Sequence, residues 1–319
     1  MSTQLLQPAI MATGLRKSYG GKVVLDGIDL NIAQGTIFAL LGPNGAGKTT
    51  AVQILSTYVR ADSGNIRVAG HDLDRDPDSV RAVIGVTGQF SAVDNLLSAR
   101  ENLLLMANLH HLSAVNGRQR VAELLEQFDL VAVSKQTPAT YSGGMRRRLD
   151  LAMTLVGNPR IIFLDEPTVG LDPRSRQAMW QVIRKLVADG VTIFLTTQDL
   201  EEADRLADRI AVLEHGKLVA EGTADELKRL IPGGHIRLQF GNATQLEAAA
   251  RTLREASRND DALCLQIPSD GGVHSLRTLL DRLDSESIKV DGLSLHIPDL
   301  DDVFFALTGN TSAEKELER

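Results

Sequence analysis

The sequence predicts an α/β fold built on a largely parallel sheet that helices cover on both faces. Strand-like and helix-like segments alternate over residues 36–214, which is the pattern that a parallel sheet requires. A glycine-rich stretch also lies between an apolar run at residues 36–41 and a segment at residues 49–59 in which apolar residues recur at helical spacing. A strand, a glycine loop and a helix therefore follow one another in the order that a phosphate site needs.

Length and composition indicate a globular protein of two domains. The chain has 319 residues, with 43% hydrophobic and 24% charged residues, which is ordinary for soluble proteins. Its net charge of -7 argues against nucleic acid as a partner, because phosphate backbones are bound through clustered Lys and Arg. We expect the one tight basic run, Arg146 to Arg148, to be a solvated helix face. The single cysteine, Cys264, favours a reducing compartment and is expected to fill the core.

Residues 12–68 are expected to be mostly strands, separated by glycine-containing turn signals. Tyr19 stands just before the first of these turns. An aromatic residue near a strand end usually packs against other apolar groups, but a purine base also needs a π-face on which to stack. Both interpretations of Tyr19 stay open at this point.

The glycine-rich stretch matches the pattern G-x-x-x-x-G-K-[ST] of the P-loop. Its glycines let several backbone N–H groups point into one concavity, and the start of the following helix adds its positive end. Lys48 is placed to reach the β- and γ-phosphates of a nucleotide, and the Thr49 hydroxyl is placed to ligate Mg²⁺. The predicted nucleotide-binding stretch consists of Gly42, Pro43, Asn44, Gly45, Ala46, Gly47, Lys48, Thr49 and Thr50.

A small helical insertion is predicted at about residues 90–157. Residues 99–111 and 121–130 have apolar residues at helical spacing, with residues 114–119 as a polar linker between them. Near its end the insertion reads Tyr-Ser-Gly-Gly-Met at residues 141–145, ahead of another helix. Ser142 is either a simple N-cap or, with its two glycines, part of a second anion-receiving helix start.

A second set of polar residues follows the buried strand that is predicted at residues 161–165. This strand ends in Asp165 and Glu166, and an unpaired charge at such a position is costly. In a P-loop protein such an Asp holds Mg²⁺, and Glu166 is placed to take a proton from a water that attacks the γ-phosphate. Two solvated acids at a strand end are the plain alternative.

The remaining segments complete the sheet and start a second domain. A helix begins at Asp172, and a strand at residues 191–195 precedes Gln198. We place the domain boundary at the helix-breaking Pro-Gly-Gly of residues 232–234, which gives domains at 1–232 and 233–319. The second domain alternates three strands with three helices, and it has neither a glycine loop nor carboxylates at a strand end. We expect it to be a small α+β domain that binds or regulates.

The ordered set of these segments resembles the nucleotide-binding subunit of an ATP-binding cassette (ABC) transporter over residues 11–230. The resemblance implies a P-loop NTPase (RecA-like) core with an antiparallel β subdomain and a helical insertion. It also implies ATP and Mg²⁺ as cofactors. For the nucleotide it implies that Tyr19 stacks on adenine, that Gly42 to Thr50 form the Walker A loop, and that Ser142, Gly143 and Gly144 form the signature.

For hydrolysis the resemblance implies that Asp165 binds Mg²⁺ and that Gln89 senses Mg²⁺ and the attacking water. Glu166 is then the catalytic base, and Asp172 belongs to a loop that links opposing sites.

In this family two subunits pair head to tail, so an ATP-dependent homodimer is implied. The signature of one subunit then closes over the triphosphate held by the other. The chain departs from the family in two places. Tyr141 and Met145 replace the common Leu and Gln of the signature, and Gln198 replaces a histidine that contacts the γ-phosphate. An amide still donates a hydrogen bond but does not titrate, so the catalytic role usually given to that histidine is open here.

The chain looks most like the ATP-binding subunits of drug-resistance exporters of the daunorubicin/doxorubicin type, and the similar segments include residues 300–309 at the C-terminus. Those subunits serve a separate integral-membrane permease of the ABC-2 type, which implies a peripheral position on the cytoplasmic face of the membrane. A soluble, non-transport ABC ATPase and the ATPase of an importer are the alternatives. The former usually has two cassettes or a coiled-coil insertion, whereas this chain has one P-loop and no sustained heptads.

Overall fold

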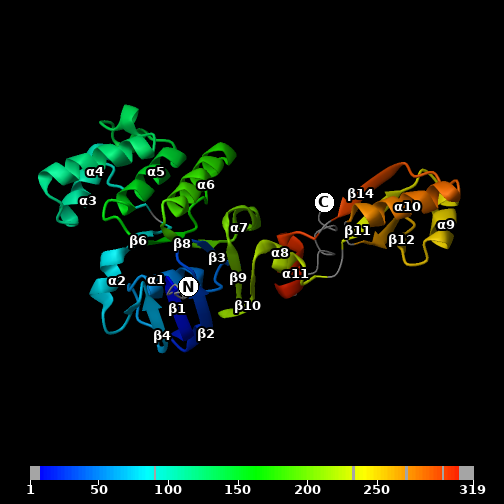
Figure 1. Cartoon of the computed structure of the whole chain (residues 1–319), viewed down its shortest axis with the longest axis horizontal. Helices are drawn as coiled ribbons and strands as arrows, with labels where there is room; N and C mark the ends of the chain where they lie inside the picture. Colours follow the sequence, from blue (N-terminus) through cyan, green and yellow to red (C-terminus); the bar gives the residue numbers. More distant parts are fainter. Residues whose placement is uncertain (1–7, 90, 232–233, 270–271, 297, 309–319) are drawn as a thin grey trace, which may run out of the picture. The chain divides into compact units, whose positions relative to one another are not determined.

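The computed structural model describes residues 8–89, 91–231, 234–269, 272–296 and 298–308 (Figure 1). The chain forms two compact units that divide between Ala224 and Asp225. The predicted boundary falls at residues 232–234, of which 232 and 233 lie outside the described part. No helix among the described residues is long and apolar enough to cross a membrane.

A six-stranded sheet organises the first unit, in the order β10-β9-β3-β8-β7-β6. All neighbouring strands are parallel except β9 and β10, which confirms the predicted α/β core. The three central strands are buried along their whole length, as the apolar run within each predicts, and β8 also buries three threonines. The strands are β3 (Ile37–Leu41), β6 (Ile84–Thr87), β7 (Ile161–Asp165), β8 (Thr192–Thr197), β9 (Arg209–Glu214) and β10 (Lys217–Gly222).

An antiparallel sheet with the order β2-β1-β4-β5 forms the predicted β subdomain. Its inward side chains share one hydrophobic core with helix α1 (Lys48–Leu55) and with aromatic residues of the main sheet, including Phe38, Phe163 and Phe194. Helix α1 is shorter than the predicted 49–59, because Thr57 adopts a left-handed backbone with φ 67°. The strands are β1 (Ile10–Tyr19), β2 (Lys22–Ile32), β4 (Ser63–Val68) and β5 (His71–Asp72).

The helical insertion lies on the other side of the main sheet from β1, β2 and β4 (Figure 1). It contains α3 (Ala99–Leu109), α4 (Ala114–Gln127) and α5 (Gly143–Thr154). The prediction of a polar linker at 114–119 is wrong, since these residues form the first turns of α4. The Ser113 side chain accepts a hydrogen bond from the Asn116 N–H and so caps the helix.

Further helices cover the main sheet or follow it. Helix α2 (Pro77–Val83), which the sequence did not indicate, begins at Asp76, whose carboxylate accepts the Ser79 N–H. Helix α6 (Pro173–Ala188) begins at Asp172 as predicted, and α7 (Leu200–Leu206) connects β8 to β9.

The second unit has a separate core around a four-stranded antiparallel sheet with the order β12-β13-β11-β14. Cys264 is buried there, as predicted. The short strand β12 was not expected, because its three residues are all exposed. The elements are α8 (Ala224–Lys228), which starts at the division, β11 (His235–Gln239), α9 (Ala243–Thr252), β12 (Ser257–Asn259), β13 (Cys264–Pro268), α10 (Val273–Ser285), β14 (Gly292–His296) and α11 (Leu300–Thr308).

Candidate nucleotide-binding site

The predicted phosphate loop connects the carboxyl end of β3 to the first residue of α1. Two of its glycines are required by close neighbours. A Cβ atom at Gly42 would lie 2.3 Å from the Leu213 carbonyl oxygen, and one at Gly47 would lie 2.7 Å from Leu25 Cδ2. Gly47 also has a φ of 114°, which only glycine adopts readily. The loop is therefore held in one path against β9 and β2.

Lys48 is buried at the centre of this loop, with 5% of its side chain exposed. Its ammonium donates to the Gly42 carbonyl at 2.8 Å and to the Pro43 carbonyl at 3.1 Å. Glu166 Oε1 lies 3.4 Å from the same nitrogen. The segments that follow β3 and β7 thus bring the Lys48 ammonium and the Glu166 carboxylate next to each other.

A pocket of about 300 Å³ opens beside this ion pair. Its volume is at the lower end of the range for small-ligand sites. The structure brings together several of the predicted residues here. The predicted residues that do not line this pocket are Tyr19, Gly42, Pro43, Ala46, Ser142, Gly143, Gly144, Asp165, Asp172 and Gln198. The lining residues are Val24, Asn44, Gly45, Gly47, Lys48, Thr49, Thr50, Gln89 and Glu166.

The end of β7 fixes the two acidic residues in different surroundings. Asp165 is buried, and its carboxylate accepts the Thr196 hydroxyl hydrogen bond at 2.5 Å. Glu166 has a left-handed backbone with φ 49°, and its N–H donates to the Thr196 carbonyl at 3.1 Å. A non-glycine residue in this region is uncommon and persists only when its surroundings hold it. The turn at Glu166 ends the strand and brings its side chain to Lys48.

Comparison with known proteins agrees with this geometry. The sequence profile of the ABC transporter family matches residues 25–169. The daunorubicin resistance ATP-binding protein DrrA3 of Streptomyces coeruleorubidus is 48% identical over 97% of this chain and 98% of its own length. The chain belongs to the ABC transporter ATP-binding family. As a member of that family it is an ATPase that binds ATP.

Other relatives of this ABC ATPase extend the comparison. The daunorubicin/doxorubicin resistance ATP-binding protein DrrA of Streptomyces peucetius is 44% identical over 100% of this chain and 97% of its own length. The Nod factor export ATP-binding protein I of Paraburkholderia xenovorans is 39% identical over 95% and 98%. A dimeric ATP-binding cassette in a post-hydrolysis state, bound to ADP and phosphate, is 28% identical with a TM-score of 0.61, covering 67% of this chain and 98% of that one.

The signature segment of the ABC ATPase begins helix α5. Ser142 is the N-cap, and its hydroxyl accepts the Met145 N–H at 3.2 Å. Gly144 packs closely against α6, where a Cβ atom would lie 2.6 Å from Ser175 Oγ. At Gly143 a Cβ would meet only Leu171 Cδ2 at 3.7 Å. Ser142 and Gly144 therefore have structural tasks within the chain, and their binding roles stay predictions.

Asp172 and Gln198 also lie at the ends of elements. Asp172 caps α6 by accepting the N–H groups of Arg174 and Ser175 at 3.1 and 3.0 Å. The hydrogen bond from the Ser175 hydroxyl lowers the pKa of Asp172. Gln198 follows β8 with its side chain exposed, and Tyr19 ends β1 with 46% exposure and the Lys17 ammonium 5.2 Å from its ring centroid.

A buried carboxylate that the sequence did not reveal supports the ends of β7 and β8. Glu202 on α7 is 1% exposed and accepts hydrogen bonds from the Thr168 hydroxyl at 2.8 Å and from Trp180 Nε1 at 3.1 Å. Burial raises the pKa of Glu202, against hydrogen bonds from Thr197, Thr168 and Trp180 that lower it. The adjacent acids at residues 201–202 look like an ordinary charged helix start, so only the tertiary contacts reveal this role.

The interpretation of the three consecutive arginines as a solvated helix face is wrong. Arg146 donates to the Pro138 carbonyl and Arg148 to the Phe128 carbonyl, each at 2.9 Å. Arg147 is directed into the protein, with 11% of its side chain exposed. The guanidinium group carries five N–H donors, and each of the three side chains donates to backbone carbonyl oxygens of the chain.

The residues present fit a Mg²⁺-bound nucleotide by their chemistry. Among the described residues no three His, Cys, Asp or Glu side chains gather into a metal cluster. Mg²⁺ bound with phosphates needs only one or two carboxylate or hydroxyl ligands and keeps several waters. The exposed Thr49 hydroxyl lies in the pocket lining, so it fits this chemistry. Asp165 is buried and does not line the pocket, and its role as a Mg²⁺ ligand stays a prediction.

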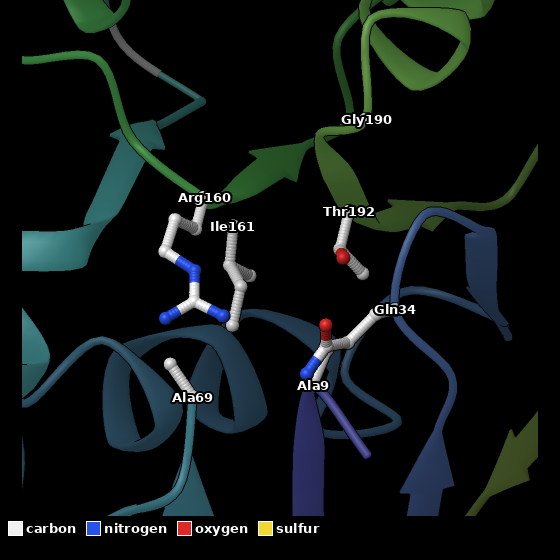
Figure 2. A pocket seen from close by; sticks show the side chains of 7 residues that line it. All are labelled: Ala9, Gln34, Ala69, Arg160, Ile161, Gly190 and Thr192. Carbon is white, nitrogen blue, oxygen red and sulfur yellow. The ribbon is translucent and has the colours of Figure 1, made fainter. Parts of the chain in front are cut away.

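A smaller cavity of about 60 Å³ lies at the opposite end of the same strands. Figure 2 shows the Arg160 and Gln34 side chains directed into it, near the first residues of β7 and β8. Ligands of parallel α/β sheets bind outside the carboxyl ends of the strands, whereas this cavity lies at the amino ends. Its volume is far below that of small-ligand sites, so it is no candidate for the nucleotide.

Proposed function

We propose that this ATPase energises the export of a hydrophobic drug, antibiotic or lipid through a separate permease of the ABC-2 type. The observation that carries the proposal is the full-length similarity to two proteins whose names state daunorubicin resistance, at 48% and 44% identity. That similarity includes the second unit as well as the cassette. The protein would work as a peripheral subunit on the cytoplasmic face of the cell membrane.

In the proposed site the chain binds ATP by its base and its phosphates. Tyr19 stacks on the adenine, and the backbone N–H groups of residues 42–50 surround the phosphates. Lys48 contacts the β- and γ-phosphates. Thr49 and Asp165 would hold Mg²⁺, with Gln89 acting through water, and the ion supplies charge neutralisation on the transferred phosphoryl group.

Glu166 is proposed as the general base. Its carboxylate is 9% exposed, lies 3.4 Å from the Lys48 ammonium and lines the pocket beside the phosphate loop, where a carboxylate can take the proton of an attacking water. Gln198 is proposed to donate a hydrogen bond to the γ-phosphate from the end of β8. Proton acceptance and phosphate orientation are thereby assigned to neighbouring strand ends.

Two copies of the chain are proposed to close around two nucleotides. Ser142, Gly143 and Gly144 of one copy then face the phosphates bound to the other, and Asp172 lies in the loop between the sites. The dimeric post-hydrolysis cassette among the similar structures supports this arrangement. The domain at 233–319 is proposed to brace the dimer or regulate it, because its core is built from its own strands and helices.

Reconstitution tests this function. The chain is coexpressed with a permease that is encoded by a neighbouring gene. The complex is purified by means of the permease and reconstituted in inside-out vesicles. We expect ATP-dependent accumulation of daunorubicin in the vesicles and stimulation of ATPase activity by the drug, both abolished by Lys48→Ala. Loss of preloaded drug from the vesicles would indicate an importer, and failure to co-purify with any membrane protein would favour a non-transport ATPase. Stimulation by a Nod factor but not by daunorubicin would favour the cargo that the name of the Nod factor relative states.

A further inference from the structure

Arg147 on α5 connects two loops that come from different strands of the main sheet. Its Nη1 donates to the Gly88 carbonyl at 2.8 Å, directly before Gln89. Its Nε donates to the Pro167 carbonyl at 2.9 Å, directly after Glu166. One planar guanidinium thus binds the backbone at the ends of both β6 and β7.

The same guanidinium also binds the backbone of the two acidic residues. Nη2 lies 3.2 Å from the Asp165 carbonyl and 3.4 Å from the Glu166 carbonyl. Glu166 has the left-handed φ of 49°, a conformation that surrounding contacts must maintain. Arg147 is therefore one of the groups that determine where the Glu166 side chain points.

Asp150, one turn later on α5, completes the contact with the loop that contains Gln89. Its carboxylate lies 3.4 Å from Arg147 Nη1 and accepts the Ala92 N–H at 3.2 Å. Burial raises the pKa of Asp150, while the Arg147 charge opposes that rise. The pair on α5 thus binds the segment after β6 at two points, Gly88 and Ala92, on either side of Gln89.

The position of Arg147 along the helix gives these contacts a functional consequence. Helix α5 begins at Gly143, with Ser142 as its cap, so Arg147 lies one turn from the signature. The geometry points to Arg147 as a positioning residue that makes the orientation of Glu166, and of the loop holding Gln89, depend on the position of the signature helix. This inference rests on the proposed roles of Glu166 and Gln89.

The neighbouring Arg148 provides a matched control. Arg148 donates to the Phe128 carbonyl within the helical insertion, and its other contact is the exposed Asp129. Neither Phe128 nor Asp129 lies at the end of a strand of the main sheet. Arg148→Gln removes a charge and a carbonyl bond from the same helix without removing a contact to residues 88 or 165–167.

The experiment compares Arg147→Gln, Arg147→Lys and Arg148→Gln in the full-length chain. Steady-state ATPase gives kcat and KM, and a fluorescent ATP analogue gives the dissociation constant. We expect Arg147→Gln to lower kcat tenfold or more while the dissociation constant changes less than threefold. Lys keeps the charge but not the planar fork, so Arg147→Lys should recover only part of the rate. Arg148→Gln should keep kcat within twofold.

A double variant separates positioning from a general loss of structure. If Arg147 acts in part through Glu166, adding Arg147→Gln to Glu166→Gln should lower the single-turnover rate by a smaller factor than Arg147→Gln costs in the wild type, because one of the two groups being positioned is already gone. A full multiplicative loss in the double variant, or equal losses in Arg147→Gln and Arg148→Gln, would overturn the inference. Should Arg147→Gln not fold, unchanged kcat in Arg147→Lys would overturn it as well. If Glu166→Gln alone keeps the wild-type rate, the proposed base is refuted independently of Arg147.

Discussion

Replacing Gly144 by alanine should destabilise the protein through a clash between α5 and α6. The added Cβ would lie 2.6 Å from Ser175 Oγ and 2.8 Å from Ser175 Cβ, closer than any ordinary contact. Overpacking of this kind costs about 1 to 3 kcal/mol. Alanine raises helix propensity by up to about 1 kcal/mol over glycine, both here and at Gly143. Gly143→Ala, with its nearest atom at 3.7 Å, is therefore the control that isolates the steric cost.

The assay uses the one tryptophan of the chain, Trp180, which is buried on the same helix as Ser175. Its fluorescence during urea denaturation reports the unfolding of this region. Gly144→Ala should be less stable than Gly143→Ala by at least about 1 kcal/mol, and the difference should largely disappear in a Ser175→Gly background. Equal stability of the two alanine variants would refute the steric explanation, and Gly144 would then be constrained only by the proposed nucleotide contact.

Three other outcomes follow from the structure. Because burial raises the pKa of Glu202, the unfolded chain loses the Glu202 proton at a lower pH than the folded chain, so the free energy of unfolding should fall as the pH rises between these two pKa values. In denaturation series from pH 4 upward, Glu202→Gln should lack this dependence on pH. An identical pH dependence in the variant would contradict the assignment. Gln198→Ala should cost about 1 to 3 kcal/mol of transition-state stabilisation in ATPase assays, whereas a hundredfold gain in Gln198→His, about 2.7 kcal/mol, would show that a titrating group is needed. A chain that ends at Gly234 should still bind ATP. If this shorter chain lost both ATP binding and the Trp180 fluorescence of the folded state, the second unit would be shown to complete the core of the first.

The central strands and the phosphate loop could be predicted because short-range pattern determines them. Buried parallel strands require unbroken apolar runs, as at β3 and β7, and a phosphate loop requires glycines at fixed spacing followed by Lys48. The predicted alternation of strands and helices ends at residue 214, which is the last residue of β9 in the structure, because a glycine turn follows it.

The supporting contacts could not be predicted, because they depend on which distant elements meet. A run of three arginines has the same local pattern whether it faces solvent or folds onto carbonyl groups, and only the approach of α5 to the ends of β6 and β7 distinguishes these cases for Arg147. The polar residues at 114–119 also satisfy two descriptions, a linker or the exposed face of a helix. These residues form a helix because Ser113 caps its first turn and Gly117 packs against Ala107.

Glu166→Gln gives the most direct measurement of how this site hydrolyses ATP. The amide keeps the shape of the side chain beside Lys48 but does not accept the proton of the attacking water. We expect turnover of ATP to fall by a factor of about 100 or more, the range for loss of a general base, with nucleotide affinity unchanged or higher because a negative charge leaves the phosphate pocket. Light scattering should then show a dimer that persists with ATP. Turnover at the wild-type rate by the Glu166→Gln protein would contradict the account.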